Sequence, residues 1–303
     1  MTTGTLKPFL RATSVTHAFV LIAAGLALLY VCLLLLLWRF QEQIVFQPPS
    51  VVASEDASAR LVRYRAEDGV ELFAFVVGDC AENTPFVIAF HGNADLARWF
   101  VPWATQLARE AGACVMIPEY RGYDGLIGAP TYAGSAHDAL AALAFARDTL
   151  HIPSDRLVYF GHSLGTAIAT ELAAIEPPRA LALQSPFSSA RAMSRRMLVP
   201  WVTAFWGLIS RVHFDTIARV RSLDVPVSVV HGDKDLIIPM EMGREVFGAA
   251  RRSGELLIVP GAGHNNVPEV GGRSYWSWLV RAVHAGDHAD ASRAAPAKTR
   301  SVP

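Results

Sequence analysis

The stretch Gly161-His162-Ser163-Leu164-Gly165 constrains the fold of this chain more strongly than any other part of its 303 residues. The run before it, Leu157–Phe160, is short, apolar and rich in aromatic residues, which predicts a buried strand. Residues 166–174 predict a helix. A serine between glycines at a strand-to-helix turn is typical of a nucleophile elbow, where close backbones leave no room for a Cβ atom. A small-residue turn without chemistry is the alternative.

Apolar strands and helical segments alternate along most of the chain. Unbroken apolar strands of this kind predict an α/β fold, with a mostly parallel central sheet and helices on both faces. The first two strands flank Glu67-Asp68-Gly69 and predict a hairpin that adds antiparallel strands at one edge. The predicted strands are residues 61–65, 70–77, 86–90, 113–117, 157–160, 180–183, 227–230 and 256–259, and further helices are predicted around 96–111, 131–149 and 193–212.

The segment Phe19–Trp38 carries no charged residue. At about 1.5 Å per residue, a helix of this length matches a hydrocarbon core of about 30 Å. Trp38 stands where an interfacial aromatic anchor is expected. Arg39-Phe40-Gln41-Glu42 follows in place of the cleavage site of a signal peptide. We therefore predict an uncleaved transmembrane helix rather than a signal peptide or a buried core helix.

Charges around this segment predict its orientation. Lys7, Arg11 and the terminal amine precede it, whereas Arg39 alone follows closely. The positive-inside rule then predicts a single-pass membrane protein with its large domain on the non-cytoplasmic side. The predicted divisions are an N-terminal tail (1–18), the anchor (19–38), a linker (39–60), the α/β domain (61–285) and a disordered tail (286–303).

Composition narrows the function classes. The formal net charge is zero and no long basic block is present, so we do not predict nucleic-acid binding. Cys32, Cys80 and Cys114 lie far apart, and their spacing predicts neither a disulfide framework nor a metal site. We expect no metal or organic cofactor, and the sequence specifies no oligomeric state.

Reactive residues follow several of the predicted strands. In open α/β sheets, functional residues gather at the carboxyl ends of the strands. Ser163, Asp235 and His264 occur in the order serine, acid, histidine, each just beyond a strand. A serine needs a base to remove its proton, histidine suits that role near neutral pH, and a buried acid orients the histidine. We therefore predict that these three residues form a catalytic triad.

Other residues compete for these roles. Asp233 lies closer to its strand than Asp235, and we expect its side chain to fix the turn by an Asx bond. His162 is adjacent to the serine but should point elsewhere if the elbow forms. A structural role for His264 remains an alternative. Three further histidines lie in helical or tail contexts and are weaker candidates: His213, His284 and His288.

Stabilisation of an oxyanion in acyl transfer requires two N–H donors. We predict that Leu164, directly after the serine, supplies one of them. The second should come from the loop His91-Gly92-Asn93-Ala94, with Asn93 as the first candidate and Ala94 as the alternative. His91 and Gly92 would shape that loop. A plain tight turn is the competing interpretation.

Together these motifs resemble the α/β-hydrolase superfamily, specifically the membrane-anchored group related to Bem46 and to mammalian α/β-hydrolase domain proteins 13 and 17. The resemblance covers most of residues 40–285 and implies the fold, hydrolase activity and the roles of Ser163, Asp235 and His264. Asp124 departs from the pattern, because relatives usually have glycine after the tyrosine, and this puts the local turn in question. The matching pieces are residues 44–48, 91–94, 118–123, 161–165, 231–239 and 261–264.

Residues 186–222 stand where this superfamily has a cap over the active site. The resemblance implies a short helical cap that bounds an acyl or alcohol pocket, and its aromatic content suits an apolar substrate. Packing of Trp201 and Trp206 on the sheet is an equal alternative. We predict a solvated face, rather than a site for anionic head groups, for Arg191, Arg195 and Arg196.

The sequence therefore predicts a membrane-anchored serine hydrolase that cleaves esters or thioesters of small molecules or lipids through an acyl-enzyme on Ser163. A serine peptidase of the same fold ranks lower, because nothing resembles the propeller domain that such enzymes often carry. A non-catalytic binding protein is the third hypothesis. Such proteins usually lose a triad member, whereas this chain keeps all three.

Overall fold

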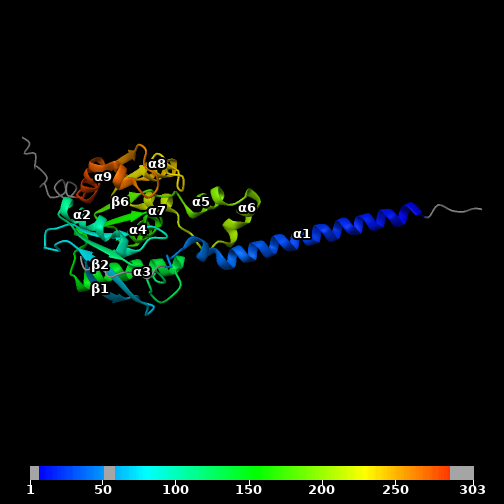
Figure 1. The fold of residues 1–303 in the computed structure, drawn as a ribbon, viewed down its shortest axis with the longest axis horizontal. Coiled ribbons are helices and arrows are strands. Elements are labelled where there is room, and N and C mark those ends of the chain that lie inside the picture. Colours follow the sequence, from blue (N-terminus) through cyan, green and yellow to red (C-terminus); the bar gives the residue numbers. More distant parts are fainter. Residues whose placement is uncertain (1–6, 51–58, 287–303) are drawn as a thin grey trace, which may run out of the picture.

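An eight-stranded sheet lies at the centre of the computed structural model, which describes residues 7–50 and 59–286 (Figure 1). Strand β2 pairs antiparallel with β1 and β4, and the other neighbours pair in parallel, so the predicted parallel sheet with a hairpin at one edge is confirmed. In spatial order the strands are β1 (Arg60–Arg65), β2 (Glu71–Val77), β4 (Cys114–Pro118), β3 (Phe86–Phe90), β5 (Leu157–His162), β6 (Ala180–Gln184), β7 (Pro226–Gly232) and β8 (Arg252–Val259).

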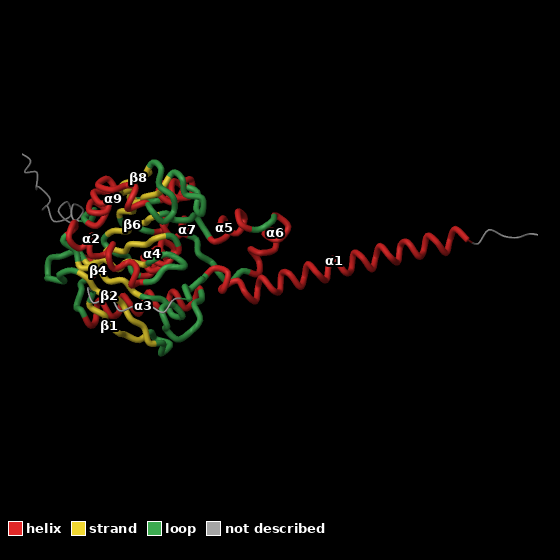
Figure 2. Tube along the Cα trace, in the orientation of Figure 1, coloured by secondary structure: helices red, strands yellow, loops and turns green. Residues whose placement is uncertain are grey.

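Helices cover both faces of the sheet (Figure 2). One face packs against α2 (Val101–Ala111), which follows the 3₁₀ turn η1 (Ala97–Phe100), and against α9 (Val267–Val283). The other face packs against α3 (Tyr132–Ala144), α4 (Leu164–Ile175), α7 (Thr216–Ser222) and α8 (Met240–Ala249). Helix α3 continues into the π-helical turn η2 (Phe145–Thr149), and the short 3₁₀ turn η3 (Ser154–Arg156) leads into β5.

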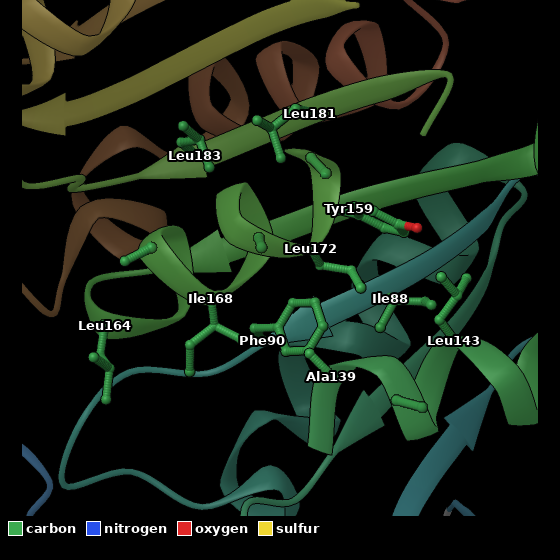
Figure 3. Close-up of a cluster of buried hydrophobic side chains, with 14 of the residues drawn as sticks. Ile88, Phe90, Ala139, Leu143, Tyr159, Leu164, Ile168, Leu172, Leu181 and Leu183 are labelled. Carbon is green, nitrogen blue, oxygen red and sulfur yellow. The ribbon is translucent and has the colours of Figure 1, made fainter. Parts of the chain in front are cut away.

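The central strands are buried on both sides, which explains their unbroken apolar sequences. In β3, Ile88 and Phe90 belong to the core under α3 and α4, whereas Val87 and Ala89 belong to the core under α2 and α9. Figure 3 shows the first of these cores, where Ile168 of α4 lies beside Phe90. Successive strand residues point to opposite faces, so burial of both faces requires an apolar residue at every position.

Helix α1 runs from Lys7 to Val45, beyond both ends of the predicted anchor at 19–38. Its residues from Val15 onward form a helix that is long and apolar enough to span a membrane. The predicted tail and linker are therefore helical at residues 7–18 and 39–45. Residues 1–6, 51–58 and 287–303 lie outside the described residues, and with them eight residues of the predicted linker and all of the predicted disordered tail except Gly286.

The cap contains two helices where one was predicted over residues 193–212. Helix α5 (Ala190–Met197) is followed by Leu198, whose backbone is extended, and α6 (Pro200–Ile209) begins two residues later. Proline disfavours helical geometry in the residue before it and removes an N–H donor, so the two helices cannot join. Both helices project from the α/β domain beside α1 (Figure 1).

The prediction that the cysteines form no disulfide is wrong. Cys80 and Cys114 are disulfide-bonded, and Cys32 is a free, exposed cysteine of α1. Strand β2 runs antiparallel to β4 with Val77 opposite Val115, so the chain leaving β2 passes the first residue of β4. The pairing depends on this alignment of strands, which the spacing of cysteines in the sequence does not reveal.

Candidate active site

Ser163 lies at the turn between β5 and α4 with φ 52° and ψ −116°, a strained backbone conformation for a residue other than glycine. A Cβ atom at Gly161 would collide with the backbone of Gly165, and one at Gly165 would collide with the carbonyl of Phe90. The two glycines therefore allow β3, β5 and α4 to approach closely around the serine. This is the geometry that the sequence pattern predicted for the elbow.

The three predicted triad side chains lie together at the carboxyl ends of their strands. The Ser163 hydroxyl lies 2.8 Å from His264 Nε2, and His264 Nδ1 lies 2.7 Å from Asp235 Oδ2. Since the carboxylate can only accept, His264 Nδ1 donates to it and Nε2 is left to accept the serine proton. The Asp235 side chain is fully buried, and the His264 side chain is almost so.

Further hydrogen bonds hold Asp235 in place. Its Oδ1 accepts from the backbone N–H groups of Ile237 and Ile238, and Nε2 of the buried His231 lies 3.2 Å from its Oδ2. Burial alone would raise the pKa of Asp235, but the hydrogen bonds from His231 and His264 outweigh it and hold the pKa below its ordinary value. Asp235 is therefore a carboxylate that can orient His264 throughout the neutral range.

Asp233 takes a different role from the predicted Asx bond. Its Oδ1 accepts from the backbone N–H of Gly261 at 2.7 Å, across to the loop that carries His264. The backbone N–H of Lys234 also donates to the Ala262 carbonyl at 2.8 Å. Asp233 therefore joins the two loops that carry the acid and the histidine, instead of fixing its own turn.

His162 points toward the His264 loop rather than at the Ser163 hydroxyl, as expected for a residue next to the serine in a formed elbow. Its Nε2 lies 3.4 Å from the His264 carbonyl oxygen, and its ring stacks on Phe100. Burial and the neighbouring His264 lower the pKa of His162 to about 3, so the ring is neutral at pH 7. Of the other histidines, His213 packs edge-on against Tyr132, His284 bonds to the Ala111 carbonyl, and His288 lies outside the described residues.

A buried ion pair supports the loop after β3. His91 Nε2 lies 2.9 Å from Oε1 of Glu119, and both side chains are fully buried. The other oxygen of Glu119 accepts from the Ala97 N–H, where η1 begins. Burial alone would lower the pKa of His91, but the charge and the hydrogen bond of Glu119 outweigh it and raise that pKa. The sequence analysis did not single out Glu119, although it stands in the matching motif 118–123.

Asn93 connects this loop to the end of α1. Its Nδ2 donates to the Val45 carbonyl at 2.6 Å, and its Oδ1 accepts from the Gln47 N–H and from the Tyr123 hydroxyl. The side chain of Asn93 is thus engaged, so only its backbone N–H is a candidate oxyanion donor. Leu164 is the first residue of α4, where helical N–H groups have no acceptor within the helix. Both residues line the same cavity as Ser163.

Asp124, the departure from the family pattern, adopts a left-handed backbone conformation with φ 47°. Its carboxylate accepts from Arg98 Nε at 2.7 Å, and little of either side chain is exposed. The turn that glycine usually forms is therefore present here with an aspartate.

Comparison with known proteins agrees with this geometry. A sequence profile for the α/β-hydrolase fold matches residues 85–207. The uncharacterized protein Rv2307c of Mycobacterium tuberculosis is 31% identical over 268 residues, which cover 87% of this chain and 92% of that protein. The chain belongs to the α/β-hydrolase family.

Within the family, this α/β hydrolase belongs to the group related to Bem46, as the resemblance implied. It is 28% identical to Bem46 of Schizosaccharomyces pombe over 247 residues, which cover 74% of this chain and 80% of Bem46. It is 29% identical to α/β-hydrolase domain-containing protein 17B of Homo sapiens over 189 residues, covering 62% of this chain and 63% of that protein.

Solved structures share the fold of this α/β hydrolase. The esterase Pf2001 of Pyrococcus furiosus superimposes with a TM-score of 0.63 at 20% sequence identity, covering 78% of this chain and 98% of that structure. The residues of that structure superimpose almost throughout, so the α/β domain matches it as a unit.

A cavity of about 960 Å³ opens onto Ser163 and His264 in this α/β hydrolase. The cap lines it, as the resemblance implied, through residues such as Phe187, Met193 and Leu198. Helix α1 also lines the cavity through Leu37, Ile44 and Val45, which the sequence analysis did not foresee. Trp201 packs neither on the sheet nor in the cavity but against α1, and the side chain of Trp206 lies outside the described part of the structure.

Within residues 7–50 and 59–286, no group of three or more histidine, cysteine, aspartate or glutamate side chains is arranged to hold a metal ion.

Proposed function

We propose that this chain is a membrane-anchored serine hydrolase that cleaves carboxylic esters or thioesters. The observation that carries the proposal is the chain of two hydrogen bonds, from Ser163 to His264 at 2.8 Å and from His264 to Asp235 at 2.7 Å. Ser163 Oγ attacks the substrate carbonyl while its proton passes to His264 Nε2. Asp235 stabilises the imidazolium that forms.

The rest of the cycle follows from the same groups. The negative charge on the carbonyl oxygen is met by the backbone N–H of Leu164 and by a second N–H, from Asn93 or Ala94. The positive end of α4 lies at the same point. His264 then protonates the leaving alcohol or thiol, which leaves an acyl group on Ser163. A water molecule, activated by His264, releases the acid and restores the serine.

The cavity favours an apolar acyl group. Its walls carry Phe187, Met193, Met197 and Leu198 of the cap and Leu37 of α1, and its volume of about 960 Å³ accommodates a ligand with a long alkyl chain. The name of the structural neighbour, an esterase, supports ester bonds over amide bonds. Comparing rates for matched p-nitrophenyl esters and p-nitroanilides of the same acids tests this preference.

The proposed nucleophile is tested by labelling with a fluorophosphonate probe. Ser163→Ala should abolish labelling and hydrolysis of p-nitrophenyl esters. Ser194→Ala is the matched control, because Ser194 lines the same cavity but donates to the Arg191 carbonyl. Labelling of Ser163→Ala at the wild-type level would contradict the proposal.

We assign α1 as the membrane anchor, with the α/β domain on the non-cytoplasmic side. Lys7 and Arg11 precede the apolar stretch, and the Cys80–Cys114 disulfide suits an oxidising compartment. Protease added to intact cells tests the orientation. We expect the protease to digest the α/β domain. Survival of the domain in cells whose membrane the protease can reach from outside would contradict this orientation.

A further inference from the structure

The segment 197–210, which spans the turn between α5 and α6 and all of α6, carries no charged residue. Arg195 and Arg196 precede it, and Arg211 follows it. An apolar segment of this length is too short to cross a bilayer and is typical of a buried core helix or of a re-entrant or interfacial segment. The exposure of its side chains distinguishes these two possibilities.

The tip of the cap is exposed rather than buried in a core. Met197 is 70% exposed, Val199 is 48% exposed and Trp201 is 56% exposed. Three large apolar side chains are thus exposed within five positions, and soluble proteins rarely leave such clusters of apolar side chains in water. We call these three residues the cap tip.

The cap tip is continuous with the apolar helix α1. Within the apolar stretch up to Trp38, the partly buried positions of α1 are Tyr30, Leu33, Leu34 and Leu37, which lie on one face of the helix. Tyr30 donates a hydrogen bond from its hydroxyl to the Trp201 carbonyl at 2.6 Å, and the two rings lie 5.5 Å apart. Figure 1 shows α6 beside α1, outside the α/β domain.

The contacts between α6 and α1 indicate how deep α6 would lie in a bilayer that α1 spans. At its far end, Arg211 donates to the Trp38 carbonyl at 3.2 Å, and its guanidinium lies 4.9 Å from the centre of the Trp38 ring. From Trp38 back to Tyr30, α1 rises by about 12 Å at about 1.5 Å per residue. With Trp38 at the interface, Trp201 lies at a depth within the hydrocarbon, whose half-thickness is about 15 Å.

Basic residues flank the uncharged segment on both sides. Arg211 lies beside Trp38 at the level of the interface, and the exposed Arg195 and Arg196 stand in the last turn of α5. The Arg191 guanidinium lies against α6 near Gly207. Long arginine side chains can reach phosphate groups while their stems lie in apolar surroundings, and each basic residue near an anionic surface adds attraction.

The cavity reaches this surface. Leu37 of α1 and Met197 and Leu198 of the cap line the same cavity as Ser163. An apolar path therefore runs from the serine to the place where the cap meets α1.

We propose that the cap tip inserts into the same bilayer as α1, so that the acyl chain of a lipid ester passes from the hydrocarbon into the cavity along the contact between α1 and the cap. The proposal rests on the membrane anchoring proposed above and deepens the substrate class to esters of membrane lipids. The partner of the cap tip is the hydrocarbon of a bilayer.

The test measures the depth of a fluorescent label. In full-length protein carrying Cys32→Ser, with the Cys80–Cys114 disulfide intact, an NBD label is placed at Trp201→Cys, at Leu26→Cys or at Ile175→Cys. The Leu26 position reports α1 itself. Ile175 is the matched control, because it is 58% exposed and lies at the end of α4 opposite to Ser163. Val199→Cys repeats the cap measurement with the Tyr30–Trp201 contact intact.

The protein is placed in vesicles of phosphatidylcholine and phosphatidylglycerol that carry a nitroxide either on the acyl chain or on the head group. We expect blue-shifted emission and stronger quenching by the acyl-chain nitroxide at positions 26, 199 and 201, and no quenching by either at position 175. Quenching at position 26 with none at 199 and 201 would overturn the cap inference alone. No quenching at position 26 would overturn the anchor, and the cap inference with it. The readout needs no turnover, so it does not depend on the proposed chemistry.

Discussion

Asp124 shows how a single residue can replace glycine at a turn. Its left-handed backbone is unfavourable for a side chain, and its carboxylate pairs with Arg98 in a largely buried position. Asp124→Ala loses the ion pair and keeps the strained backbone, whereas Asp124→Gly loses the pair but relieves the strain. We expect Asp124→Ala to be less stable than Asp124→Gly by about 1 kcal/mol, measured as the free energy of unfolding in urea. Equal stabilities would contradict this account.

His162 makes the fold sensitive to acid. Above its ordinary pKa of 6.5 the ring is neutral in both states, so its contribution to stability does not change with pH. Below that value the unfolded chain takes up a proton that the folded chain does not accept until about pH 3. Below pH 6.5, protonation of this ring in the unfolded chain should therefore lower the free energy of unfolding by about 1.4 kcal/mol for each unit by which the pH falls.

The measurement compares wild type with His162→Asn by urea unfolding between pH 7 and pH 5. The wild-type protein should lose stability more steeply toward pH 5 than the variant. Parallel curves would show that the ring is protonated in the folded state as easily as in the unfolded state.

Several residue positions could be predicted from the sequence, because each follows an apolar strand. Ser163, Asp235 and His264 are brought together, as their positions after β5, β7 and β8 predicted. Glu119 and the partner of Cys80 could not be found in this way. Their contacts depend on how β4 aligns with β2 and β3, and no local pattern records that alignment.

At the scale of elements, Asn93 joins the end of α1 to the loop that faces the serine. Asn93→Ala removes the hydrogen bonds to Val45, Gln47 and Tyr123, but keeps the backbone N–H of the loop. A small displacement of catalytic donors is costly, so we expect kcat/KM for a p-nitrophenyl ester to fall by about tenfold or more. Gln47→Ala is the control, because the Gln47 backbone N–H still donates to Asn93. Wild-type kcat/KM in Asn93→Ala would refute the coupling.

The sequence predicted that helices are present at these places more accurately than it predicted where each helix ends. The apolar run stops at Trp38, but the helix continues, because Gln41 and Glu42 have partners in the domain. Gln41 accepts from the Arg211 N–H, and Glu42 accepts from the Tyr132 N–H. In the cap, Pro200 marks the break between α5 and α6, whereas helical periodicity alone suggests one continuous helix.

For the whole molecule, the end of α1 belongs to the α/β domain as much as to the long apolar helix. Phe46 is buried in the main core, and Ile44 and Val45 line the cavity. A chain that begins at residue 39 should therefore keep its turnover of soluble esters. A chain that begins at residue 48 should lose that turnover and at least about 3 kcal/mol of stability, as expected for loss of a buried phenylalanine. Equal turnover and equal unfolding midpoints of the two truncations would contradict this view.

In the proposed arrangement, α1 both crosses the bilayer and lines the cavity beside Ser163, so we expect that another protein's membrane helix cannot simply replace it. A chimaera that carries the membrane helix of another protein should keep this chain from Tyr30 onward, because the face of α1 that contacts the cap begins there. Bilayers of different thickness tilt such a helix to different degrees. Because Asn93 donates to the Val45 carbonyl at the end of α1, the proposed arrangement predicts that the rate of ester hydrolysis depends on the thickness of the surrounding bilayer.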